Sequence, residues 1–226
     1  MALFYFSMIL TGCSTHGLVF PGPTGSIGRG AHDYAQYYKR RIARDQQAFS
    51  ELRALEKDGR SVAKSASDMV GKTRLSVGGE HFRYDCSGFV EAVYASVGNP
   101  ISGSTKMLFE SSKEKGVYHR NKRPLPGDLA FFDNSHDRNK NGRRDDKLTH
   151  VAIVEQVDHD GAITLVHLGS RGIMRITMNL EQPKAHKSES GKVWNSFLRA
   201  RRTKKDRGPR LTGELWTGFA RFWGTT

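Results

Sequence analysis

Residues 84–90 read Tyr84-Asp85-Cys86-Ser87-Gly88-Phe89-Val90, and this stretch indicates the fold. The following residues, 87–97, carry an apolar face at helical spacing and are followed by a Gly-Asn-Pro stop, which predicts a helix. Cys86 therefore lies where a helix begins, and unpaired N–H groups and partial positive charge at that end favour a thiolate. We expect Cys86 to be a nucleophile with a lowered pKa and Gly88 to remove bulk beside the sulfur. A buried, inert cysteine would not explain this position.

A thiol enzyme also needs a base and a group that orients the base. His150 opens a predicted strand at 150–157, and His167 lies near the end of the next predicted strand, at 162–168. Asp158-His159-Asp160-Gly161 predicts a hairpin turn between these strands. A two- or four-residue loop places both imidazoles on the same face of the sheet, because side chains alternate along a strand. His150 is therefore the expected base and His167 its partner.

The remaining pattern predicts an α+β domain. Helices are expected at 31–57, ended by Asp58-Gly59, and at 61–70. Further strands are expected at 129–133 and 172–180. Helices in the first half and an antiparallel sheet in the second define this fold class.

Three segments together resemble the NlpC-type cell-wall cysteine peptidases, whose close cousins are the CHAP amidases. They are residues 85–90, Pro126-Gly127-Asp128-Leu129, and His150-Val151-Ala152-Ile153-Val154. The resemblance covers about residues 61–180. It implies a circularly permuted papain-like domain, with helices packed on an antiparallel sheet, and a triad of Cys86, His150 and His167. It also implies cleavage of peptidoglycan stem peptides, usually at the γ-D-glutamyl-diaminopimelate bond.

The same resemblance suggests substrate-binding residues and leaves alternatives open. Asp85 and Ser87 match positions that hold the free amine of the peptide, and Leu75 stands where a tyrosine of the oxyanion site is common, so Tyr84 is a candidate substitute. His167 lies 17 positions after His150, a spacing closer to the CHAP pattern. A CHAP-like amidase, a thiol acyltransferase and a non-catalytic wall-binding module are the alternatives.

The charge of the chain indicates an anionic partner. There are 36 basic and 23 acidic residues, a formal net charge of +13, and this excess fits nucleic acid, a lipid surface or an acidic polymer such as the cell wall. Export, inferred next, argues against nucleic acid. We expect a monomer that needs no cofactor for catalysis.

The first segment predicts export and a lipid anchor. Residues 1–12 are apolar and end in Leu10-Thr11-Gly12 before Cys13, as in a bacterial lipoprotein signal peptide. Cys13 is the expected lipidation site, and residues 13–30, rich in Gly, Pro, Ser and Thr, form the expected tether. Because Ser14 is not the aspartate associated with inner-membrane retention, we expect attachment to the outer membrane on its periplasmic face. The two cysteines of the chain differ too much in context for a disulfide between them.

The domain plan that follows has a helical arm at 31–60, a peptidase domain at 61–198 and a basic, aromatic C-terminal extension at 199–226. Residues 199–210 carry seven basic residues and one acidic residue. This run is either a solvated loop or a patch that binds anionic wall or lipid headgroups.

A polar loop between the expected strands matches the start of a calcium loop. Oxygen-bearing side chains recur at alternate positions and a glycine stands at the sixth, which favours a structural Ca²⁺ site over an ordinary turn. The twelfth position is Leu148 in place of glutamate, so the EF-hand pattern is incomplete, and five basic residues crowd the loop. The expected ligands, with Arg143 contributing its carbonyl, are Asp137, Asn139, Asn141, Arg143, Asp145 and Asp146.

Overall fold

The structure is a computed structural model of the chain and describes residues 30–201 and 207–224. The chain divides between residues 46 and 47 into two compact units. In the first unit, residues 30–46 are helical and Tyr37, Tyr38 and Ile42 are exposed. Cys13 and the expected tether lie outside the described residues. Across the described ranges, no helix has both the length and the apolar character needed to cross a membrane.

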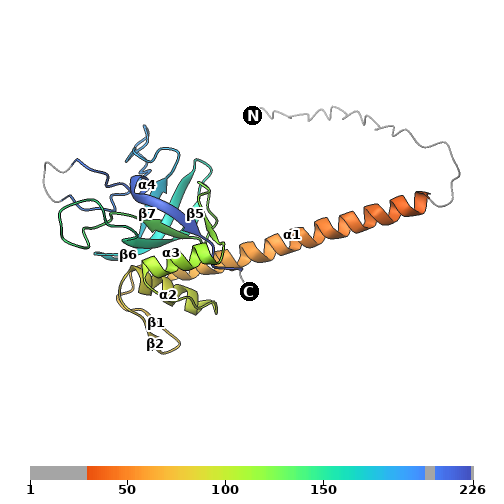
Figure 1. Cartoon of the computed structure of the whole chain (residues 1–226), viewed down its shortest axis with the longest axis horizontal. Helices are drawn as coiled ribbons and strands as arrows, with labels where there is room; N and C mark the ends of the chain where they lie inside the picture. The colour runs from red at the N-terminus through yellow and green to blue at the C-terminus, as the bar shows by residue number, and fades with distance from the viewer. Residues whose placement is uncertain (1–29, 202–206, 225–226) are drawn as a thin grey trace, which may run out of the picture. The chain divides into compact units, whose positions relative to one another are not determined.

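The three long helices come before the long strands, as the sequence predicts, while the short β1–β2 hairpin lies between α1 and α2 and the short α4 lies between β7 and β8 (Figure 1). The helices are α1 (Gly30–Asp68), α2 (Cys86–Ser96), α3 (Thr105–Glu114) and α4 (Thr212–Leu215). The strands are β1 (Ser76–Val77), β2 (Glu80–His81), β3 (Tyr118–His119), β4 (Leu129–Phe132), β5 (His150–Val157), β6 (Ala162–Gly169), β7 (Gly172–Asn179) and β8 (Trp216–Ala220).

The second unit is built on a six-stranded antiparallel sheet with the order β3-β8-β4-β5-β6-β7. One face packs on α2 and on the end of α1, through a cluster that includes Val62, Phe89, Val151 and Ile153. The other face packs on the chain around α4, through a cluster that includes Ile176 and Leu215. The α+β class with helices on an antiparallel sheet, consistent with a papain-like domain, is therefore confirmed.

The predicted end of the first helix at Asp58-Gly59 is wrong, because α1 continues to Asp68. Gly59 is buried, and a Cβ atom there would overlap the carbonyl oxygen of Pro126 and lie 2.8 Å from the Trp223 ring. A Cβ at Gly127 would lie 2.6 Å from the Gly59 carbonyl oxygen. The glycine pair thus permits close contact of three segments that are distant in sequence. The expected second helix at 61–70 is the last part of α1.

The predicted boundary between residues 198 and 199 divides the sheet and is therefore misplaced. β8 lies between β3 and β4, with Leu129 paired to Ala220 and Tyr118 paired to Ala220 on the other side. Phe222 and Trp223, which follow β8, are buried in the core. The residues expected to form an extension supply an interior strand of the domain.

Buried Asp128 explains the Pro-Gly-Asp segment structurally. Its carboxylate is fully buried, accepts hydrogen bonds from the Leu125 N–H and the Arg221 guanidinium, and lies 3.1 Å from His119 Nε2. Arg221 follows β8, so the ion pair ties β8 to the start of β4. A buried carboxylate with this many partners fixes the geometry of the strands, because leaving it unpaired is costly.

Candidate active site

Cys86 is the first residue of α2, where the sequence predicts it. Asp85 is the N-cap, and its Oδ1 accepts hydrogen bonds from the Gly88 N–H at 2.8 Å and from the Ser87 hydroxyl at 2.8 Å. The Cys86 sulfur lies 3.7 Å from the Thr105 hydroxyl of α3 and also receives a backbone hydrogen bond from Val151 in β5. The thiol, at the start of α2, therefore contacts the start of α3 and the second residue of β5, the strand that begins with His150.

The expected lowering of the Cys86 pKa is wrong in direction. Burial raises the pKa of the thiol above its ordinary value of 9.0, and the nearby Asp85 carboxylate raises it further. Hydrogen bonds from Thr105, Val151 and Ser87 favour the thiolate but do not offset the burial. The role expected for Gly88 is also corrected, because a Cβ there would overlap the Arg83 carbonyl oxygen and not the sulfur.

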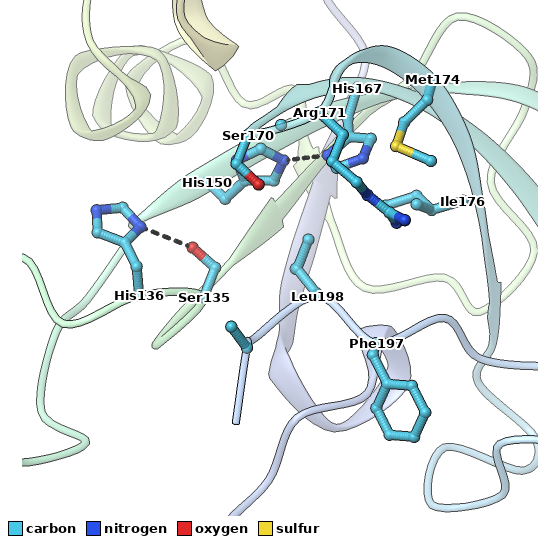
Figure 2. A pocket seen from close by; sticks show the side chains of 12 residues that line it. Ser135, His136, His150, His167, Ser170, Arg171, Met174, Ile176, Phe197 and Leu198 are labelled. Carbon is cyan, nitrogen blue, oxygen red and sulfur yellow. Dashed lines mark hydrogen bonds between the residues drawn. The ribbon is translucent and has the colours of Figure 1, made fainter. Parts of the chain in front are cut away.

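His150 and His167 are brought together as the sequence predicts. His150 Nε2 lies 2.8 Å from His167 Nδ1, the two rings are nearly perpendicular, and both residues are buried (Figure 2). His150 Nδ1 is the ring nitrogen that takes no part in this contact. The arrangement resembles that of a base oriented by a second imidazole.

The shared face arises for a different reason from the one predicted. The hairpin pairs Val157 with Ile163, so its loop has an odd number of residues, and this register alone would place the two imidazoles on opposite faces. A β-bulge between Val154 and Gln156 shifts the pairing by one residue, so that Ile153 pairs with Val166. The bulge restores the parity that puts His150 and His167 on one face.

Burial keeps both imidazoles neutral. Desolvation, with a smaller effect from His167, lowers the pKa of His150 from 6.5 to about 3. Desolvation, with a smaller effect from the Arg171 guanidinium, lowers the pKa of His167 to about 4. Gly169 leaves room for the His167 ring, because a Cβ there would lie 2.8 Å from His167 Cε1.

The three expected substrate-binding residues lie around the start of α2 but are engaged in different ways. Asp85 is exposed and caps the helix, whereas Ser87 is buried and donates to Asp85. The Tyr84 hydroxyl donates to the Lys72 carbonyl oxygen at 2.9 Å, so its proton is not directed at the sulfur. Leu75, in the place of the common tyrosine, is buried in the core.

A cavity of about 470 Å³ opens beside the histidine pair. Figure 2 shows His150 and His167 on its wall and the Arg171 side chain reaching into it from the β6–β7 turn. Cys86 is not among its lining residues. The walls combine polar and apolar side chains: Ser135, His136, His150, His167, Gly169, Ser170, Arg171, Met174, Ile176, Phe197, Leu198 and Ala200.

The expected calcium loop lies between β4 and β5, and its oxygens serve the loop itself. The Asp137, Asn139 and Asn141 side chains accept hydrogen bonds from the N–H groups of Gly142, Asn141 and Arg143. Asp145 accepts from the Asn141 amide, and buried Asp146 accepts from the Arg138 N–H. No group of three or more His, Cys, Asp or Glu side chains in the described ranges could hold a metal ion. Calcium stays a prediction that depends on the Asn and carbonyl oxygens.

Sequence reasoning missed several residues of the site. Thr105, the first residue of α3, lies beside the Cys86 sulfur. Ser104 is the N-cap of α3, and its hydroxyl accepts a hydrogen bond from the Met107 N–H, so this serine could have indicated the start of the helix. Gly169 and Arg171 lie close in sequence to His167, but no sequence signal places them against the His167 ring and in the cavity. Two further histidines outside the site, His119 and His186, are partly buried.

A thiol at the start of a helix that packs on an antiparallel sheet carrying an imidazole pair is the arrangement expected of papain-like cysteine peptidases and amidases. Within this class, residues 77–168 match the CHAP domain, a peptidase/amidase domain related to the NlpC-type family. No curated protein matches the chain. CHAP domains are typically hydrolases of peptidoglycan, so this match suggests, at that coarse level, an enzyme that hydrolyses peptidoglycan.

Proposed function

We propose that this protein is a cysteine peptidase that cleaves peptidoglycan stem peptides, with the γ-D-glutamyl-diaminopimelate bond as its target. Cys86 is the nucleophile, His150 the general base and His167 the group that orients His150. The observation that carries the proposal is the 2.8 Å contact between His150 Nε2 and His167 Nδ1, on a sheet whose Val151, the residue after His150, donates a backbone hydrogen bond to the Cys86 sulfur.

The protonation states support attack by a thiol that is deprotonated during the reaction. A thiol pKa above 9.0 and an imidazole pKa of about 3 make both groups neutral at pH 7. His150 Nδ1 takes the thiol proton as the sulfur bonds to the scissile carbonyl carbon. The same nitrogen then gives this proton to the leaving amine as the carbon–nitrogen bond breaks, which leaves a thioester. Water, deprotonated by His150, attacks the thioester, and the thiol leaves with the proton.

The start of α2 supplies the donor for the oxyanion in this proposal. The N–H groups of the first helical turn have no intrahelical acceptor, and the Cys86 N–H lies directly beside the nucleophile. Tyr84 does not fill this role, since its hydroxyl donates to the Lys72 carbonyl.

Digestion of purified sacculi followed by mass spectrometry tests the proposed bond. Fragments with a new amino terminus on diaminopimelate support the endopeptidase. Cys86→Ser and His150→Ala should each reduce the rate by at least about 100-fold while the protein stays folded, and His167→Ala should lose less. Wild-type rates in Cys86→Ser would overturn the assignment of the nucleophile.

A CHAP-like amidase is the second candidate, because the matched domain includes amidases and the gap between the histidines is long. Fragments that begin with the first alanine of the stem, released from a sugar bearing a free lactyl carboxylate, would favour it. A thiol acyltransferase would give new amide products. A non-catalytic wall-binding module would bind sacculi and release nothing.

The proposed location is the periplasmic face of the outer membrane, with lipid on Cys13. This rests on the sequence of residues 1–30 alone. In the same proposal the protein acts as a monomer on wall peptides and does not bind nucleic acid.

A further inference from the structure

Two groups at the cavity beside the histidine pair, the Arg171 guanidinium and His167 Nε2, have no hydrogen-bond partner among the residues that the structure describes. The Arg171 guanidinium has no hydrogen bond or ion pair within the described residues. The His167 residue is only 6 % exposed, and its buried Nε2 atom has no hydrogen-bond partner among the described residues. Both residues line the same cavity of about 470 Å³.

The proposed chemistry requires that His167 Nε2 carries a hydrogen and is therefore a hydrogen-bond donor. If His150 Nδ1 is to accept the thiol proton, His150 Nε2 must carry a hydrogen and donate it to His167 Nδ1. The hydrogen of neutral His167 is then on Nε2. A buried N–H with no acceptor is unfavourable, so the active tautomer creates a demand for an acceptor in the cavity.

We propose that this cavity is a carboxylate subsite, in which a carboxylate of the stem peptide binds the Arg171 guanidinium and accepts a hydrogen bond from His167 Nε2. The planar guanidinium fork matches a carboxylate, and Ser170 lies at the same wall. Met174, Ile176 and Leu198 give the cavity an apolar side that suits the methylene groups of an acidic side chain.

This inference rests on the proposed function and deepens it. Because the glutamate of the stem is linked through its γ-carboxyl group, its α-carboxylate is free, and diaminopimelate brings a second free carboxylate. Cys86 does not line the cavity, so the bound carboxylate is a recognition group and not the group that is cleaved. Substrate binding then fixes the tautomer in which His150 can act as a base.

A first experiment tests the subsite without turnover. Full-length Cys86→Ala protein with ¹⁵N-labelled histidine is titrated with acetate and then with the stem tripeptide. We expect saturable shifts of the His167 imidazole nitrogens and a pKa of His167 that rises from about 4, because a nearby negative charge favours the imidazolium. Arg171→Gln should weaken both effects. Unchanged His167 resonances with both probes would overturn the proposal.

A second experiment identifies the source of the carboxylate. The experiment compares three proteins: wild type, Arg171→Gln and the control Arg74→Gln, which removes an exposed charge away from the cavity. Each protein is assayed on the tripeptide and on versions of it that are amidated at either the glutamate or the diaminopimelate carboxyl. One amidation should reduce kcat/KM about 10- to 100-fold in wild type and in Arg74→Gln, and much less in Arg171→Gln.

The two proposals fail in different ways. Acetate shifts without cleavage of any peptide would leave the anion site standing and reject the endopeptidase. Equal cleavage of all three peptides by all three proteins would keep the endopeptidase and reject the stem-peptide subsite. Binding of acetate with equal binding of amidated and free peptides would also reject the stem peptide as the source.

Discussion

Gly169 is expected to limit the position of the His167 ring, and Gly169→Ala tests this. A Cβ at residue 169 would lie 2.8 Å from His167 Cε1, whereas ordinary van der Waals contact begins at 3.4 Å. The backbone of Gly169 does not have a positive φ, so alanine adds no backbone strain. The ring must therefore move by several tenths of an ångström, and its hydrogen bond to His150 must stretch from 2.8 Å.

The expected cost has two parts. A stretched hydrogen bond loses about 0.5–1.5 kcal/mol, which corresponds to about a 2- to 10-fold lower kcat if the bond orients His150 during catalysis. Overpacking of the site should lower the free energy of unfolding by about 1–3 kcal/mol. Urea denaturation measures the second part, and release of labelled fragments from sacculi measures the first.

A double-mutant cycle separates an effect through the His167 ring from general damage. In a His167→Ala background the ring is absent, so adding Gly169→Ala should cost almost nothing more in stability or in rate. Equal losses with and without the ring would refute the reasoning, as would full activity of Gly169→Ala on its own.

The histidine pair and two other regions of the chain give three further expectations. The pKa values of His150 and His167, about 3 and 4 in the folded protein, return to about 6.5 on unfolding, so the unfolded state binds more protons below pH 6.5. The free energy of unfolding should therefore fall as the pH drops from about 6.5 to about 4. The urea midpoint of the wild type should fall more steeply with pH than that of the double variant His150→Gln/His167→Gln. If the loop at 137–146 binds calcium, calorimetry at millimolar Ca²⁺ should show heat that Asp137→Asn/Asp145→Asn abolishes, and chelator should lower activity by loosening the start of β5; no heat and full activity in chelator would leave an ordinary loop. Mature protein from cells should begin at Cys13 and carry acyl mass, which Cys13→Ala removes; an unprocessed wild-type amino terminus would contradict the anchor.

Local patterns in the sequence were enough for much of the fold. The predicted strand at 150–157 agrees with β5, and the predicted helix at 87–97 lies within one residue of α2. An apolar alternation and a capped helix start are properties of neighbouring residues, so they can be read without knowing the rest of the chain. Cys86, His150 and His167 were identified in this way.

The errors share a cause, which is contact between distant residues. Gly59 looked like a helix end because its packing against Pro126 and Trp223 is invisible locally. The predicted Cys86 pKa is wrong because the sequence shows the helix start, which lowers the pKa, and does not show the burial of the sulfur, which raises it. The turn residues do not show that the β5–β6 loop has an odd number of residues, nor that a bulge in β5 shifts the register and returns the two histidines to one face.

The place of β8 in the sheet has a consequence for the order in which the protein can be completed. Among the described strands, β3 pairs with β8 alone, and β4 has β8 as one of its two neighbours. A growing chain that has reached the end of β7 therefore exposes an unpaired edge of β4 beside the histidine strand. The sheet closes only when residue 220 has left the ribosome, long after Cys86 and His150 have emerged. A chain made only as far as β7 thus does not yet hold the proposed thiol and base on a complete sheet.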